Sequence, residues 1–130
     1  MEYKKIILLD DNPTSFFYVE DVLSELFPDI GVQTFEDPDS FLEEFKNSFH
    51  HASEKILLLL DIMMPKKNGF DVLEEIDVEC GEIDNMDVVI LTSSHLESDL
   101  KKASRFPVVI GYIEKPFNKE KMEKVLTGSN

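Results

Sequence analysis

Hydrophobic residues in this chain gather in short runs that are separated by longer amphipathic segments. Four runs are continuously apolar and cover residues 6–9, 56–60, 88–91 and 108–113. Continuous runs of this length are typical of β-strands buried on both faces, as in a parallel sheet covered by helices. Residues 32–35 alternate between apolar and polar side chains instead, so we expect an edge strand there.

Between these runs, apolar side chains recur at helical spacing, which predicts a helix in each interval. The five stripes are Phe16, Val19, Leu23, Leu26 and Phe27; Phe41, Leu42, Phe45 and Phe49; Phe70, Leu73 and Ile76; Leu96, Leu100 and Ala103; and Met122, Val125 and Leu126. We expect these side chains to lie in the core, because the apolar face of a helix packs inward. Residues 77–87 are polar and acidic, and we expect them to form a long surface loop.

Strand and helix therefore alternate five times, which predicts a doubly wound α/β fold with a parallel sheet and right-handed crossovers. The length of 130 residues suits one domain, and no internal repeat or linker divides it. We expect a single domain over residues 1–130. In such folds the functional site lies beyond the carboxyl ends of the strands.

The composition limits the classes of partner and the compartment. The mixture of 42% apolar and 31% charged residues is typical of a globular protein. A formal net charge of −14 repels phosphate backbones and anionic lipid, so direct nucleic-acid binding is not expected. The first apolar run is too short for a signal peptide, and no run approaches the length of a membrane helix. We expect a cytoplasmic protein without membrane insertion, and the single cysteine, Cys80, excludes an internal disulfide.

Polar residues close four of the apolar runs. They are Asp10 and Asp11, then Asp61, then residues 92–94, and finally residues 114–116. Because the carboxyl ends of parallel strands meet at one edge of a sheet, we expect these side chains to converge. Three crowded carboxylates raise one another's pKa, and a hard cation such as Mg²⁺ removes that conflict.

The remaining residue types at these strand ends point to phosphate chemistry. A lysine supplies a point charge for phosphate oxygens, and a threonine hydroxyl can donate to a phosphoryl oxygen once that group has arrived. Together with the carboxylates they describe a carboxylate nucleophile that attacks a phosphorus centre. Each residue alone has a simpler explanation, since Asp10 and Asp11 beside Asn12 could cap a helix and Lys115 could lie on the surface. The joint occurrence at successive strand ends favours the phosphate chemistry.

The motifs that carry these residues resemble the receiver domain of two-component response regulators, of which the chemotaxis receiver is the best-known single-domain form. The resemblance extends from about Lys4 to about Leu126. Its motifs are Ile7-Leu8-Leu9-Asp10-Asp11, Leu60-Asp61-Ile62-Met63-Met64-Pro65 followed by Asn68-Gly69-Phe70, Leu91-Thr92-Ser93, and Glu114-Lys115-Pro116-Phe117. The resemblance implies a flavodoxin-like parallel sheet with strand order 2-1-3-4-5 and five helices.

The resemblance also implies a phosphoacceptor and a Mg²⁺ site. Asp61 is expected to accept the phosphoryl group and to contribute to the metal site. Asp11 is expected to be a direct metal ligand, whereas Asp10 acts largely through water. The backbone carbonyl of Met63 is expected to complete the protein ligands, and Lys115 to contact the phosphoryl group.

A conformational switch is implied as well. The hydroxyl of Thr92 is expected to move toward the phosphoryl group, and the ring of Tyr112 to rotate into the space that it leaves. The surface formed by the fourth helix, fifth strand and fifth helix would then change its affinity for a partner. The bond between Lys115 and Pro116 is expected to be cis, and Gly69, with Pro65, is expected to shape the loop after the acceptor.

Three alternatives lead to different functions. A haloacid-dehalogenase-type phosphatase also uses a strand-end aspartate on Mg²⁺, but it needs a second aspartate where this chain has Met63. A flavin-binding domain of similar fold would need a phosphate-cradling loop after the first strand, which the sequence lacks. A receiver-like interaction module that is not regulated by phosphorylation remains the main alternative, although all five signature positions are filled.

We therefore expect a stand-alone receiver that takes its phosphoryl group from a sensor histidine kinase or phosphotransfer protein and acts on a downstream protein target or as a carrier in a relay. It is not expected to be an enzyme in the usual sense, since it catalyses only its own phosphorylation and dephosphorylation. Met63 and Ser94 occupy positions that tune dephosphorylation in receivers, and neither supplies an acid or amide, so we expect moderate to slow loss. No output domain is expected after the short last helix, which ends near Thr127, and His50, His51 and His95 are expected on the surface.

Overall fold

The structure of the protein is a computed structural model that describes residues 3–49, 53–81, 83–93 and 97–128. It contains a five-stranded parallel sheet in the order β2-β1-β3-β4-β5, which confirms the predicted fold class and strand order. The elements along the chain are β1 (Lys5–Leu9), the 3-10 helix η1 (Pro13–Ser15), α1 (Phe16–Leu26), β2 (Val32–Phe35), α2 (Pro38–Asn47), β3 (Ile56–Asp61), α3 (Gly69–Cys80), β4 (Met86–Thr92), α4 (Glu97–Ala103), β5 (Val109–Glu114) and α5 (Lys119–Thr127).

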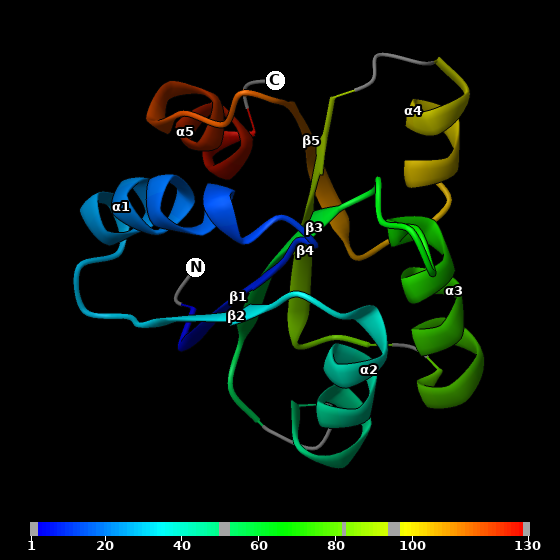
Figure 1. Cartoon of the computed structure of the whole chain (residues 1–130). Helices are drawn as coiled ribbons and strands as arrows, with labels where there is room; N and C mark the ends of the chain where they lie inside the picture. Colours follow the sequence, from blue (N-terminus) through cyan, green and yellow to red (C-terminus); the bar gives the residue numbers. More distant parts are fainter. Residues whose placement is uncertain (1–2, 50–52, 82, 94–96, 129–130) are drawn as a thin grey trace.

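Helices cover both faces of the sheet. Figure 1 shows α1 and α5 on one side and α3 and α4 on the other, and α2 packs with α3 in the same apolar cluster. Successive residues of β3 point to opposite faces, so Leu58 lies in the cluster under α2 and α3, whereas Leu57 lies in the cluster under α1 and α5. This two-sided burial explains why the central strands are continuously apolar in sequence.

Asparagine or aspartate begins the helical segment that follows each of four strands. The side chains of Asn12, Asp37, Asn68 and Asn118 each accept a hydrogen bond from a backbone N–H of the first turn that follows. These caps satisfy donors that have no partner within the helix. They also place the start of each helix close to the carboxyl edge of the sheet, where the polar strand ends lie.

The two edge strands differ in how well the sequence predicted them. β2 is an edge strand, as its alternating pattern indicates. β5 lies at the other edge, as the predicted strand order requires, but its run 108–113 has the pattern of a strand buried on both faces, and of residues 109–114 only Ile113 is buried. Only β4 pairs with β5, and Ile110 is 36% exposed. A Cβ at Gly111 would overlap the side chain of Val125, so this glycine lets α5 approach β5 closely.

The loop between α3 and β4 is shorter than predicted. Residues 77–80 form the last turn of α3, and Met86 and Asp87 begin β4, so the prediction of a loop over 77–87 is wrong at both ends. The last turn of α3 is exposed, with Val78 at 83%, and hydrophobic periodicity therefore carries no signal there. Asp87 pairs with Leu57 of β3, and its side chain accepts a hydrogen bond of 2.6 Å from the hydroxyl of Tyr3.

The last helix ends at Thr127, where the sequence places its end. Within the described ranges, no helix has the length and apolar content needed to cross a membrane. The predictions for His50, His51, Ser94 and His95 fall on residues outside the described ranges.

Candidate functional site

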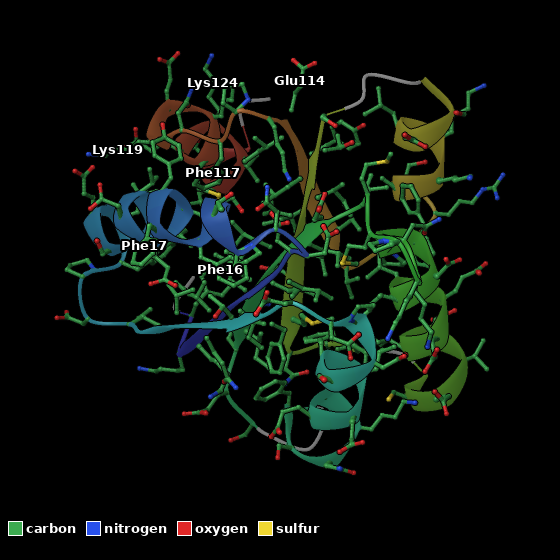
Figure 2. All side chains as sticks on the ribbon, in the orientation of Figure 1. Phe16, Phe17, Glu114, Phe117, Lys119 and Lys124 are labelled. Carbon is green, nitrogen blue, oxygen red and sulfur yellow. The ribbon has the colours of Figure 1, made fainter. Side chains whose placement is uncertain are left out.

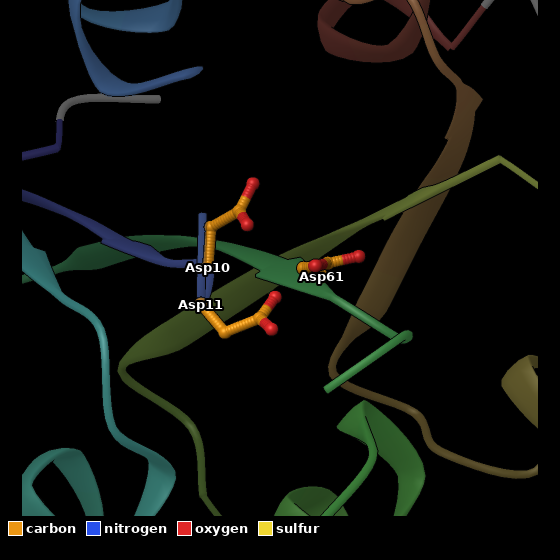
Figure 3. Close-up of side chains that lie close together, drawn as sticks. All are labelled: Asp10, Asp11 and Asp61. Atoms are coloured by element: carbon orange, nitrogen blue, oxygen red, sulfur yellow. The ribbon is translucent and has the colours of Figure 1, made fainter. Parts of the chain in front are cut away.

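Three carboxylates converge at the carboxyl edge of the sheet, as Figure 3 shows for Asp10, Asp11 and Asp61. One oxygen from each side chain lies within 4.8 Å of the other two. Asp10 and Asp11 follow β1 and Asp61 ends β3, and these strands are direct neighbours in the sheet. The convergence expected from the strand ends is therefore present.

The surroundings of Asp61 disfavour its negative charge. Asp10 and Asp61 are both buried, whereas Asp11 is half-buried. Burial and the neighbouring Asp10 carboxylate raise the pKa of Asp61 to about 7, although the ammonium group of Lys115 acts in the opposite direction. A set of crowded oxygens that resists full ionisation at neutral pH is the chemistry that a hard divalent cation relieves. The residues present thus fit a metal ion with oxygen ligands.

Asp10 is held from several directions by the protein itself. Its Oδ1 accepts a hydrogen bond of 2.9 Å from the backbone N–H of Asn12, and its Oδ2 accepts one of 3.0 Å from the hydroxyl of Ser15. Asn12, rather than Asp10 or Asp11, caps the helical segment that follows. The capping explanation therefore applies to Asn12, and the carboxylate of Asp10 is oriented toward Asp61.

Lys115, which follows the edge strand β5, places its ammonium group near the carboxylates of Asp10 and Asp61. Its Nζ lies 3.3 Å from Oδ2 of Asp10 and 3.6 Å from Oδ1 of Asp61. Its backbone N–H donates a 2.7 Å hydrogen bond to the carbonyl of Thr92, and the bond to Pro116 is cis, as expected. A single ammonium group thus lies within ion-pair distance of both buried carboxylates.

Thr92 and Tyr112 lie on neighbouring strands and interact. Thr92 is buried at the end of β4, one position beyond Leu91, which pairs with Asp61. Burial raises the pKa of the Tyr112 hydroxyl, and a side-chain hydrogen bond with Thr92 partly opposes that shift. The two residues expected to form the switch are therefore in contact.

The loop after Asp61 returns tightly against the end of β3. The backbone N–H of Met63 donates a 3.2 Å hydrogen bond to Oδ1 of Asp61, while the side chain of Met63 is 60% exposed. A Cβ at Gly69 would lie 2.9 Å from the carbonyl oxygen of Asp61, which is too close for any residue but glycine. Gly69 therefore lets the start of α3 lie directly against the end of β3, and this close approach helps to shape the loop after Asp61.

Two residues near the site were missed by the sequence analysis. Ser15 donates to Asp10, and the ammonium group of Lys121 donates to the backbone on both sides of Lys115. A serine in a turn-forming segment and a lysine in a charged helix carry no signal of their own in a single sequence. The only available hint was their position just after a strand-end motif.

A cavity of about 340 Å³ lies elsewhere, between α3, β4 and the segment that leads into β5. Its lining includes Leu73, Ile76, Met86 and Phe106, and none of the three clustered aspartates. The carboxylates are thus outside this cavity.

Comparisons with curated proteins identify relatives of this chain. The family model of the response regulator receiver domain matches residues 6–127. The chain is 34% identical over 91 residues to the transcriptional regulatory protein DcuR of Escherichia coli, a match that covers 68% of this chain and 36% of DcuR. It is 29% identical over 128 residues to the response regulator Rcp1 of Synechocystis sp., covering 96% of this chain and 85% of Rcp1. The chain therefore spans about a third of DcuR and most of Rcp1.

Solved structures show the same fold. The phosphorylated cyanobacterial phytochrome response regulator RcpA matches with a TM-score of 0.74 and 28% identity, covering 98% of this chain and 91% of that one. The chemotaxis protein CheY4 of Vibrio cholerae matches with a TM-score of 0.76 over 99% of this chain and 100% of that one. The sequence identity to CheY4 is 19%, and this similarity therefore supports the fold alone.

Proposed function

Since the chain belongs to the response regulator receiver domain family, we propose that it accepts a phosphoryl group on the carboxylate of Asp61 and signals through this modification. The observation that carries the proposal is the meeting of three carboxylates with the ammonium group of Lys115, 3.6 Å from Oδ1 of Asp61. Receiver domains are signalling domains. The phosphoryl transfer would therefore yield a phosphorylated form of the protein itself, with altered contacts to its partner, and would not release a converted substrate.

The transfer itself is a displacement at phosphorus. A carboxylate oxygen of Asp61 attacks the phosphorus of a phosphohistidine on a sensor kinase or phosphotransfer protein, and an aspartyl phosphate forms. The bond from phosphorus to the imidazole nitrogen breaks, and the nitrogen keeps the electron pair. The released histidine is neutral once its protonation adjusts with solvent. A small acyl phosphate serves the same reaction, with a carboxylate as the leaving group.

Asp10, Asp11 and Asp61, with the backbone carbonyl of Met63, are the groups that would hold Mg²⁺. When bound, the ion supplies positive charge next to the phosphoryl oxygens, which is the main requirement of phosphoryl transfer. The support for this metal is the all-oxygen set and the raised pKa of Asp61, which results first from burial and then from the neighbouring Asp10 carboxylate.

Lys115 and Thr92 would bind the phosphoryl group after transfer. The ammonium group of Lys115, which now lies between Asp10 and Asp61, would form a charge-assisted hydrogen bond to a phosphoryl oxygen. The hydroxyl of Thr92 would donate to another. The phosphoryl group adds about −1.5 to −2 charge to the site, and these two donors would stabilise that charge.

The response would be read by a protein partner. When Thr92 turns toward the phosphoryl group, Tyr112 loses its hydrogen-bond partner and can rotate, which alters the surface of α4, β5 and α5. Leu100 and Ile110 on this surface are exposed apolar side chains, a feature of contact sites. A coupling of about 1–3 kcal/mol is typical for such a switch.

The proposal includes a single receiver domain over residues 1–130, and its support is the 85% of Rcp1 that the chain covers. It also includes slow to moderate loss of the phosphoryl group, because the exposed side chain of Met63 has no acid or amide to orient a water molecule. Autocatalysis is limited to the protein's own phosphorylation and dephosphorylation.

The proposal is tested with acetyl phosphate and Mg²⁺, followed by intact mass spectrometry. The wild-type protein should gain one phosphoryl group, and both the Asp61→Asn variant and the wild type in EDTA should gain none. Full labelling of Asp61→Asn would show that another residue is the acceptor. A wild-type protein that stays unlabelled by acetyl phosphate and by phosphorylated kinases would favour the interaction module that is not regulated by phosphorylation.

A further inference from the structure

We propose that Lys121 is a positioning residue that holds Lys115 in place for phosphoryl transfer, an inference that rests on the proposed function. The ammonium nitrogen of Lys121 lies 2.9 Å from the carbonyl oxygen of Glu114 and 2.9 Å from that of Pro116. These two residues flank Lys115 on either side. One side chain from α5 therefore holds the backbone immediately before and after the lysine that reaches the acceptor.

The position of Lys121 in its helix indicates that its two hydrogen bonds to the carbonyls are favourable enough to offset an electrostatic cost. Lys121 lies in the first turn of α5, where Asn118 caps the helix by accepting a 2.8 Å hydrogen bond from the backbone N–H of Lys121. A cation in the first turn opposes the helix dipole and is unfavourable there by itself. The two carbonyl oxygens offset this cost, because a charged donor forms stronger hydrogen bonds than a neutral one.

The backbone of Lys121 is held in place because α5 packs against the core. The next residue, Met122, is fully buried, and Phe117 packs between α1 and α5, as Figure 2 shows. The helix that carries Lys121 is therefore fixed against the core. Its side chain can restrain a loop only because its own backbone does not move with that loop.

The restraint acts on the backbone from which the side chain of Lys115 extends. Residues 114–116 are held at three points, namely the two carbonyls bound by Lys121 and the backbone N–H of Lys115, which donates to Thr92. Without Lys121, the carbonyls of Glu114 and Pro116 would turn to water and this backbone would gain freedom. A long side chain on a mobile backbone spends less time between Asp10 and Asp61, and misplacement of this size slows a reaction that depends on positioning.

Lys124 provides a matched control on the same helix. It lies three residues further along α5, and its ammonium group pairs at 3.5 Å with Glu120, one turn earlier. Figure 2 shows Lys124 on the outer side of α5. Lys124→Met therefore removes the same charge from the same helix and leaves the two hydrogen bonds of Lys121 to the carbonyls of Glu114 and Pro116 in place.

The experiment compares the wild type, Lys121→Met, Lys121→Arg and Lys124→Met for their rates of labelling by acetyl phosphate with Mg²⁺. Lys121→Met should label about 5- to 10-fold more slowly, and Lys121→Arg should recover much of the rate because a guanidinium also donates to two carbonyls. Lys124→Met should match the wild type. A Lys121→Met protein that labels at the wild-type rate, beside a wild type that does label, overturns the inference and leaves the proposed function intact. An unlabelled wild type overturns both.

Two further readouts separate positioning from a general loss of structure. In a Lys115→Met background, adding Lys121→Met should slow labelling no further, because Lys121 acts through Lys115. An additive loss would overturn the inference. In protein without donor or metal, amide hydrogen exchange over residues 114–117 should be faster in Lys121→Met than in Lys124→Met or the wild type. Unchanged exchange in that segment would also overturn it.

Discussion

A side-chain hydrogen bond joins Thr92, at the end of β4, to Tyr112 on β5. Thr92 is buried and Tyr112 is half-buried, so the bond lies at the boundary between the site and the surface. A threonine hydroxyl carries one proton, and donating that proton to a phosphoryl oxygen requires its bond with Tyr112 to rearrange. Under the proposed function, the pair would link a modification at Asp61 to a change at the protein surface.

The first prediction concerns the environment of Tyr112. Phosphorylation should change the tyrosine fluorescence of the protein, because the ring loses its contact with Thr92. The change should persist in Tyr18→Phe, whose ring is exposed on α1, and disappear in Tyr112→Phe. Thr92→Ala should reduce it while leaving Asp61 able to accept the phosphoryl group. An identical fluorescence change in Tyr112→Phe would exclude this ring as the reporter.

A second prediction links Asp61 to stability and pH. The raised pKa of about 7 means that the folded protein without metal holds a proton on Asp61 that the unfolded chain releases near pH 3.8. Its stability should therefore fall as pH rises between these values, since the folded form binds more protons in that window. Asp61→Asn should remove this loss and raise the free energy of unfolding at pH 8 by about 2 kcal/mol.

Urea denaturation in EDTA at pH 5 and pH 8 measures this effect. The difference between wild type and Asp61→Asn should be larger at pH 8, and saturating Mg²⁺ should stabilise the wild type by neutralising the same charges. Equal stabilities of the two proteins at both pH values would contradict the predicted repulsion.

A third prediction concerns docking of the phosphodonor. Phe17 is 84% exposed on α1 (Figure 2), two residues after Ser15, which contacts Asp10. An exposed phenylalanine beside the site is suited to contact a donor protein. Phe17→Ala should slow transfer from a phosphorylated histidine phosphotransfer protein by about 10-fold and leave labelling by acetyl phosphate unchanged. Val78→Ala, equally exposed at the distant end of α3, should change neither rate, and an equal loss with both donors would assign Phe17 a structural role.

The fourth prediction concerns the start of α3. Gly69→Ala would place its Cβ 2.9 Å from the Asp61 carbonyl oxygen and 3.1 Å from the Cα of Ile62, both of which are backbone atoms. The strand or the helix must shift, so the free energy of unfolding should fall by about 1–3 kcal/mol and labelling of Asp61 should slow. Gly31→Ala meets no atom within 4 Å and should be neutral or slightly stabilising. Thermal unfolding of the two variants provides the comparison.

Much of the fold could be predicted because burial leaves a local record in the sequence. Leu57 and Leu58 face opposite sides of β3, and a strand covered on both sides must be apolar at every position. Asp61 stands out because it ends such a strand. The pattern was misleading for the burial of β5, since Ile110 is apolar although it is 36% exposed, and hydrophobicity reports the residue type and not how fully other elements cover it.

The sequence by itself determined which residue types stand at the strand ends, and through parallel topology it determined that Asp10, Asp11 and Asp61 would meet. Only the tertiary structure decided which groups hold them there. Lys115 reaches Asp10 across 105 positions of the chain, and Lys121 reaches the backbone around Lys115 from the first turn of α5. Such contacts depend on the docking of helices and the direction of individual side chains. A periodic pattern encodes which face of an element is buried, and it does not encode the partner that each polar atom finds.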